Sequence, residues 1–102
     1  MNKVLLDLRK KIKNRQLELA VVGLGYVGFP LALEFARKGI KVVGIEIDSG
    51  RLNSITQRKS YISDISSNEL KDALSSGYFR ASADFSDIRQ ADAVLICVPT
   101  PL

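Results

Sequence analysis

Three glycines, Gly23, Gly25 and Gly28, follow the apolar segment 17–22 in the spacing Gly-x-Gly-x-x-Gly. Between a strand and a helix, the first glycine allows a tight turn, the second lets a diphosphate approach the backbone, and the third lets the helix pack closely. The N–H groups and dipole of the helix N-terminus then favour the phosphate charge. The spacing therefore predicts a dinucleotide site. A turn without a ligand is the alternative, although two glycines would suffice for it.

An acidic residue ends the next apolar run. Glu46 lies 18 residues after Gly28, close to the separation of about 20 residues at which a carboxylate accepts hydrogen bonds from the adenosine ribose. A carboxylate there repels a 2′-phosphate, so we predict NAD rather than NADP. A solvated strand end is the alternative for Glu46. Asp48 either contacts the cofactor or serves as a helix N-cap. Arg51 either contacts the cofactor or is a surface charge of the helix.

The loop after the last apolar run is the third candidate. Val98, Pro99 and Thr100 are followed by a second proline, and prolines stiffen a loop. Thr100 offers a hydroxyl or a backbone N–H, whereas the alternative is a rigid turn without a ligand. The predicted cofactor-binding set is Gly23, Leu24, Gly25, Tyr26, Val27, Gly28, Glu46, Asp48, Arg51, Val98, Pro99 and Thr100.

The remaining reactive side chains are interpreted as packing residues. The lone cysteine, Cys97, lies inside the last apolar run and is expected to be a small buried hydrophobe rather than a nucleophile. The rings of Tyr26 and Tyr61 are also expected to pack. The chain has no histidine, which removes His-based triads and His general bases. We therefore predict no catalytic residue and no metal ligand.

Hydrophobic periodicity predicts the elements that position these residues. Helices are expected at residues 3–14, 26–38, 49–57 and 66–77, strands at 17–22, 40–47, 78–83 and 93–98, and one helical turn at 86–90. Strands that alternate with helices indicate right-handed crossovers and a parallel sheet. The predicted fold class is therefore α/β, a partial Rossmann fold with strand order 3-2-1-4. In that order the loop at Val98 lies across from Gly25.

The basic charge of the chain is concentrated at its N-terminus. Residues 1–16 hold six basic side chains and one acidic one, whereas residues 17–102 hold nine basic and ten acidic. We therefore divide the chain into a basic amphipathic helix (residues 1–16) and a nucleotide-binding unit (residues 17–102). The helix is expected to dock by its apolar side with a solvated basic face; an anionic membrane or a polyanion is the alternative. We expect no nucleic-acid partner, and no apolar run is long enough to span a membrane.

Four segments together resemble the NAD-binding domain of the UDP-glucose/GDP-mannose dehydrogenase family. They are residues 21–36 (VVGLGYVGFPLALEFA), 43–48 (VGIEID), 60–64 (SYISD) and 96–102 (ICVPTPL). The N-terminal helix and residues 60–62 are similar to the branch acting on UDP-N-acetyl-hexosamines. The resemblance places the pyrophosphate on the glycine turn, the ribose on Glu46 (where Asp is more usual) and the adenosine portion near Arg51.

The resemblance implies an enzyme that oxidises the C6 alcohol of a UDP-sugar to a carboxylate with two NAD⁺. The family's Cys nucleophile and its helpers lie in later segments, and Cys97 does not match it, so this chain alone is expected to be inactive. A regulatory module that senses NAD(H) without catalysis is the alternative. A different dehydrogenase, of hydroxyacyl or phosphogluconate type, is opposed by residues 98–101. We further expect a homo-oligomer and, from the single thiol, a cytoplasmic setting.

Overall fold

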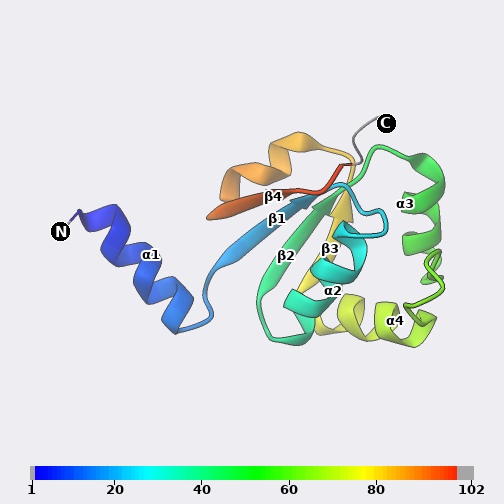
Figure 1. The fold of residues 1–102 in the computed structure, drawn as a ribbon, viewed down its shortest axis with the longest axis horizontal. Helices are drawn as coiled ribbons and strands as arrows, with labels where there is room; N and C mark the ends of the chain where they lie inside the picture. The colour runs from blue at the N-terminus through cyan, green and yellow to red at the C-terminus, as the bar shows by residue number, and fades with distance from the viewer. Residues whose placement is uncertain (1, 99–102) are drawn as a thin grey trace.

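A computed structural model describes residues 2–98 (Figure 1). Its elements are α1 (Lys3–Lys13), β1 (Glu18–Val22), α2 (Gly28–Arg37), β2 (Lys41–Ile45), α3 (Ser49–Thr56), α4 (Ser67–Ser76), β3 (Phe79–Ser82), the 3₁₀ helix η1 (Phe85–Gln90) and β4 (Ala93–Ile96). All strand pairs are parallel, in the order β3-β2-β1-β4. The predicted α/β fold class and strand order are confirmed.

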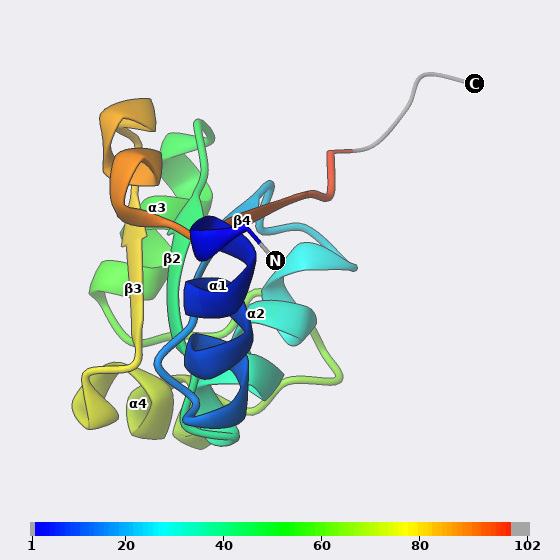
Figure 2. The same cartoon turned by 90° about the vertical axis from the view of Figure 1, so that its left-hand side faces the viewer.

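The larger apolar core lies between one face of the sheet and helices α2, α3 and α4 (Figure 2). Leu19 and Val21 of β1 point into it, whereas Ala20 between them points to the opposite face, as the two-residue period of a strand requires. Full burial of one such large side chain contributes about 1.5–3 kcal/mol. Phe29, in the first turn of α2, is completely buried and stacks on Tyr61 with ring centroids 4.6 Å apart. The start of α2 is thereby fixed against the core.

The helix ends follow the residue types that the sequence places there. Asp48 caps α3 and Ser66 caps α4, each accepting a hydrogen bond from the backbone N–H three residues on. Gly39 and Gly77 follow α2 and α4 with φ of +80° and +79°, a conformation that glycine adopts without strain. The expected α2 begins two residues late, at Gly28, because Tyr26 and Val27 belong to the turn.

Strand β4 forms one edge of the sheet, and this changes two expectations. The strand ends at Ile96 rather than Val98, although the Cys97 N–H still donates to the Val22 carbonyl at 2.7 Å. Ile96 is 72% exposed, and Cys97 is half-buried rather than buried. The prediction of a buried cysteine is wrong because no strand covers the outer side of β4 in the described residues.

Helix α1 is the predicted amphipathic helix. It projects to one side of the sheet (Figure 1), and none of its residues is fully buried. Contacts at and just after its C-terminal end tie it to the body. Lys11 Nζ lies 2.7 Å from Asp92 Oδ1, and Arg15 Nη1 donates to the Lys38 carbonyl at 3.2 Å. No helix within residues 2–98 is long and apolar enough to cross a membrane. The expected docking of the apolar side of α1 is thus not made within the described chain.

Candidate functional site

The glycine turn connects β1 to α2 at the carboxyl end of the sheet. Gly23 has φ of +96°, and its N–H donates to the Ile45 carbonyl at 2.8 Å. A Cβ added at Gly28 would lie 1.7 Å from the Gly23 carbonyl oxygen, a separation that no side chain tolerates. Gly23 and Gly28 are therefore required by the turn itself, as the spacing predicts.

Gly25 differs from these two glycines because nothing in the polypeptide crowds it. The atoms nearest to an added Cβ belong to the Arg51 guanidinium, at 3.7–3.9 Å, which is ordinary van der Waals contact. An open stretch of backbone with a cation beside it, at a helix N-terminus, fits a diphosphate. The geometry of Gly25 therefore fits the phosphates of a dinucleotide without being needed for the fold.

Glu46 follows β2 directly and is 5% exposed. Its Oε1 accepts from the Leu24 N–H (2.9 Å) and from Arg51 Nη1 (3.2 Å). Its Oε2 accepts from the N–H groups of Ile47 (3.0 Å) and Asp48 (3.1 Å). The carboxylate thus ties the end of β2 to the glycine turn, and the alternative of a solvated strand end is wrong.

These donors decide the protonation of Glu46. Burial raises the pKa of the carboxyl group, but the N–H groups of Asp48 and Leu24 and the Arg51 guanidinium outweigh it, so the pKa lies below the ordinary glutamate value. The side chain is ionised at neutral pH, and it is an acceptor only. An ionised carboxylate at this position suits the hydroxyls of a ribose.

Asp48 and Arg51 have the roles of helix cap and site cation. Asp48 Oδ1 accepts from the Arg51 N–H at 3.1 Å, which is the N-cap alternative. The Arg51 side chain is 36% exposed and reaches back to Glu46, with its guanidinium carbon 6.0 Å from the ring centroid of Tyr61. The interpretation of Arg51 as a surface helix charge is wrong, because the side chain lies inside the site.

Tyr61 packs as expected, and it also has a polar role. Its ring stacks on Phe29, and its hydroxyl donates to the Leu24 carbonyl at 2.5 Å. Burial and the charge of Glu46 raise the pKa of the hydroxyl, so it remains a donor. The motif at residues 60–64 was the available signal, but it did not reveal this bond to the turn. Tyr26, also expected to pack, is 82% exposed instead.

A cavity of about 300 Å³ lies beside the turn, and Glu46 is not among the residues that line it. It is lined by part of the predicted set, Gly25, Tyr26, Asp48 and Arg51, together with Gly50, Ser54, Tyr61 and Ile62. Leu24 is fully buried, and its N–H and carbonyl are engaged by Glu46 and Tyr61. Val27 and Val98 are exposed. Val98 flanks Gly23, because a Cβ added at Gly23 would lie 3.2 Å from Val98 Cγ1. Pro99 and Thr100 lie outside the described residues.

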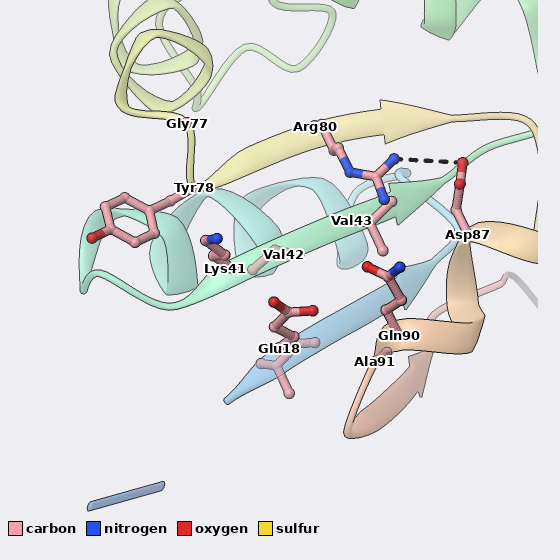
Figure 3. A pocket seen from close by; sticks show the side chains of 11 residues that line it. Glu18, Lys41, Val42, Val43, Gly77, Tyr78, Arg80, Asp87, Gln90 and Ala91 are labelled. Atoms are coloured by element: carbon pink, nitrogen blue, oxygen red, sulfur yellow. Dashed lines mark ion pairs between the residues drawn. The ribbon is translucent and has the colours of Figure 1, made fainter. Parts of the chain in front are cut away.

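A second cavity, of about 190 Å³, lies at the amino ends of the strands, on the face of η1 (Figure 3). Arg80 of β3 and Asp87 of η1 form an ion pair of 3.5 Å across it, and Glu18 and Lys41 lie at its other side. It contains none of the residues predicted for the cofactor. Among residues 2–98 we find no group of His, Cys, Asp or Glu side chains that could hold a metal ion.

A parallel sheet in the order β3-β2-β1-β4 has its topological switch point between β1 and β4, and the glycine turn lies at the carboxyl end of β1. Ligands of such sheets bind at that edge. The fold, the turn and the buried carboxylate at the end of β2 together define a dinucleotide-binding domain of the Rossmann class.

Comparison with known proteins narrows this class to a family. Residues 17–102 match the model of the UDP-glucose/GDP-mannose dehydrogenase family, NAD binding domain. The chain belongs to this family, and its cofactor is NAD. The resemblance noted in the sequence is thereby confirmed.

Three relatives illustrate the similarity. The chain is 36% identical to UDP-N-acetyl-D-glucosamine 6-dehydrogenase of Pseudomonas aeruginosa over 86% of its own length and 20% of the relative's. It superimposes on the UDP-D-ManNAc dehydrogenase of Pyrococcus horikoshii with a TM-score of 0.77 and 36% identity, over 84% of this chain and 21% of that one. It also superimposes on the NDP-N-acetyl-D-galactosaminuronic acid dehydrogenase of Methanosarcina mazei with a TM-score of 0.69 and 28% identity. That match covers 99% of this chain and 23% of that one. The chain thus spans about a fifth of the relatives it matches.

Proposed function

We propose that the glycine turn and the groups around Glu46 hold the adenosine diphosphate half of NAD. The observation that carries this proposal is the pairing of the uncrowded backbone at Gly25 with the ionised, buried Glu46. In this assignment the turn binds the pyrophosphate, Glu46 accepts from the ribose hydroxyls, and Val98 flanks the turn at Gly23. The division of the chain at residue 17 is part of the same proposal, and the first residue of the family match supports it.

Binding on this geometry is an exchange of partners. All four acceptor positions of Glu46 are filled, and Arg51 is the one donor among them that belongs to a side chain. We propose that Arg51 leaves Glu46 Oε1 for the diphosphate, beside Gly25, and that a ribose hydroxyl takes its place on Oε1. The backbone donors from Leu24, Ile47 and Asp48 stay, so the carboxylate keeps its orientation.

We further propose that the domain serves an NAD-dependent dehydrogenase acting on a UDP-N-acetyl-hexosamine, because the relatives at 36% identity are named for such activities. NAD supplies the hydride acceptor when bound. Oxidation of a C6 alcohol to a carboxylate removes two hydrides and consumes one water, so two NAD⁺ are reduced. This chain positions NAD and lacks the nucleophile, so alone it reduces none. The half-buried free thiol of Cys97 agrees with a reducing, cytoplasmic setting.

Isothermal titration of the chain with NAD⁺ and NADP⁺ tests the cofactor site. We expect NAD⁺ to bind and NADP⁺ to bind at least tenfold more weakly, because Glu46 repels the 2′-phosphate. Glu46→Gln removes this repulsion, so the discrimination should shrink in that variant. Equal binding of both cofactors by the wild-type chain would contradict the ribose assignment.

A chimaera tests the activity. Residues 17–102 replace the matched segment of the Pseudomonas aeruginosa enzyme, and NADH formation is followed with UDP-N-acetylglucosamine. We expect turnover, and its loss in the Gly25→Ala chimaera that still folds. A folded chimaera that binds NAD⁺ without turnover would separate the cofactor site from the proposed activity. The alternative of a sensing module is not favoured, because the matched relatives carry enzyme names.

A further inference from the structure

Helix α1 presents an apolar stripe that the described chain covers only in part, at Leu8. Val4, Leu5, Leu8 and Ile12 fall within roughly 100° of arc around the helix, at 100° per residue. Val4 is 73% exposed and Ile12 57%. The opposite side of the helix is basic. An unpaired stripe of this kind on a charged helix is typical of a surface that packs on a partner.

The contacts of α1 with its own body leave Val4, Leu5 and Ile12 of the stripe exposed, whereas Leu8 is half-buried. Asp92 accepts a hydrogen bond from Lys11 Nζ on Oδ1 and from the Glu18 N–H on Oδ2. The Arg15 guanidinium donates to the Lys38 carbonyl. These contacts raise the pKa of Lys11 and lower that of Asp92, so both groups remain charged across the neutral range. The helix is therefore anchored at its C-terminal half beside the starts of β1 and β4.

A groove of about 620 Å³ between α2 and α4 has the complementary composition. Its floor is apolar and includes Leu33, Ala36 and Ala73, all buried. Its rim is acidic, because Glu69 and Asp72 of α4 line it and are exposed, as is Glu34 of α2. Arg37, the basic residue of this lining, is already bonded to Glu34.

We propose that the α2–α4 groove of one copy of this chain receives the apolar stripe of α1 from a second copy. The stripe would cover the floor of the groove, and the positive charge of the helix would be attracted to the acidic rim. Residues 1–16 carry net charge +5 and residues 17–102 net charge −1, so the two surfaces attract across copies. Reciprocal exchange gives two identical contacts about a twofold axis, a closed arrangement. The proposal is independent of the cofactor site.

Sedimentation equilibrium of the whole chain tests the proposal with a matched pair. Leu5 lies on the stripe and Leu6 off it, and their exposures are nearly equal, 46% and 45%. We expect the wild-type chain to dimerise, Leu5→Asp to weaken dimerisation at least tenfold, and Leu6→Asp to change it less than twofold. Because both variants place an aspartate at neighbouring positions of one helix, loss of helicity affects them alike.

The groove is tested separately. Asp72→Lys reverses a rim charge and should weaken dimerisation, whereas Ser75→Lys, on the same helix outside the groove, should not. An equal mixture of Leu5→Asp and Asp72→Lys chains should recover part of the association, since one intact helix then meets one intact groove.

Three outcomes would overturn the proposal. The first is a wild-type chain that stays monomeric at millimolar concentration. The second is a dimer that neither Leu5→Asp nor Leu6→Asp weakens, as pairing of β4 edges would give. The third is a monomer that binds anionic vesicles through Leu5. Titration with NAD⁺ on the same variants should be unchanged, so failure here leaves the cofactor assignment standing.

Discussion

Replacing Gly25 by alanine separates the fold from the cofactor site. The backbone at Gly25 does not have a positive φ, unlike that at Gly23, and an added methyl group meets nothing nearer than the Arg51 guanidinium at 3.7 Å. A glycine-to-alanine change at such a position stabilises a protein by about 0.4–1 kcal/mol, because it restricts the unfolded chain. We therefore expect Gly25→Ala to unfold at the same or slightly higher urea concentration than the wild type.

Binding should respond in the opposite direction. The methyl group occupies the space through which a diphosphate reaches the backbone, and an overpacked methyl group costs about 1–3 kcal/mol. That cost corresponds to a loss of NAD⁺ affinity of about 5- to 150-fold. Adenosine, which has no diphosphate, should lose nothing.

Ligand-observed NMR and urea unfolding on the same samples provide the measurements. Higher stability with weaker NAD⁺ binding is the expected combination. If the folded variant binds NAD⁺ as tightly as the wild type, the diphosphate does not approach Gly25, and the assignment of the turn is refuted. Equal losses for NAD⁺ and adenosine would likewise place the diphosphate elsewhere.

Three further changes probe the same turn. Gly28→Ala should prevent a native fold, because its Cβ would lie 1.7 Å from the Gly23 carbonyl oxygen. The expected observation is loss of cooperative unfolding, and a stable Gly28→Ala chain would contradict the geometry. Glu46→Gln should destabilise the chain by about 1–3 kcal/mol at neutral pH, since its amide faces N–H donors. The pKa of Glu46 is lowered in the folded chain. The stabilisation by its carboxylate is therefore present above the ordinary glutamate pKa of about 4.3 and is lost as the pH falls below that value. The urea midpoints of wild type and variant should converge in acid, and a constant difference between them would disprove the ionised carboxylate. Tyr61→Phe keeps the ring stacked on Phe29 and loses the hydrogen bond to the Leu24 carbonyl. The free energy of unfolding should fall by about 1 kcal/mol. An unchanged urea midpoint would show that the hydroxyl does not stabilise the turn.

The fold was largely predictable because its signals are local. Apolar runs of four to eight residues alternate with helical periodicity, and capping residues such as Asp48 and Ser66 stand at the helix starts. Strand order follows from the glycine turn and from the handedness of crossovers. The exposure of Cys97 was not predictable, because it depends on what covers β4 and not on the apolar character of the run.

The sequence indicated that Glu46 and Arg51 lie near the glycine turn, but not which hydrogen bonds they make there. The spacing of Glu46 from the glycines indicated a carboxylate near the turn, yet not that four donors would surround it. Those donors come from Leu24, which is 22 residues earlier, from the turn into α3, and from the Arg51 side chain in α3. The bond from Tyr61 to Leu24 spans 37 residues. Long-range bonds of this kind depend on how loops close over the sheet, which neither periodicity nor spacing encodes.

The bonding of Glu46 also bears on how NAD is distinguished from NADP. While Arg51 is paired with it, the carboxylate is locally neutralised and would repel a 2′-phosphate only weakly. Once Arg51 moves to the diphosphate, the negative charge of Glu46 is uncovered at the ribose. The backbone N–H groups of Leu24, Ile47 and Asp48 would still favour the ionised carboxylate, so in this proposal the repulsion is greatest in the bound state, where discrimination is decided. In the proposed binding mode, selectivity therefore depends on the movement of Arg51 as well as on the identity of Glu46.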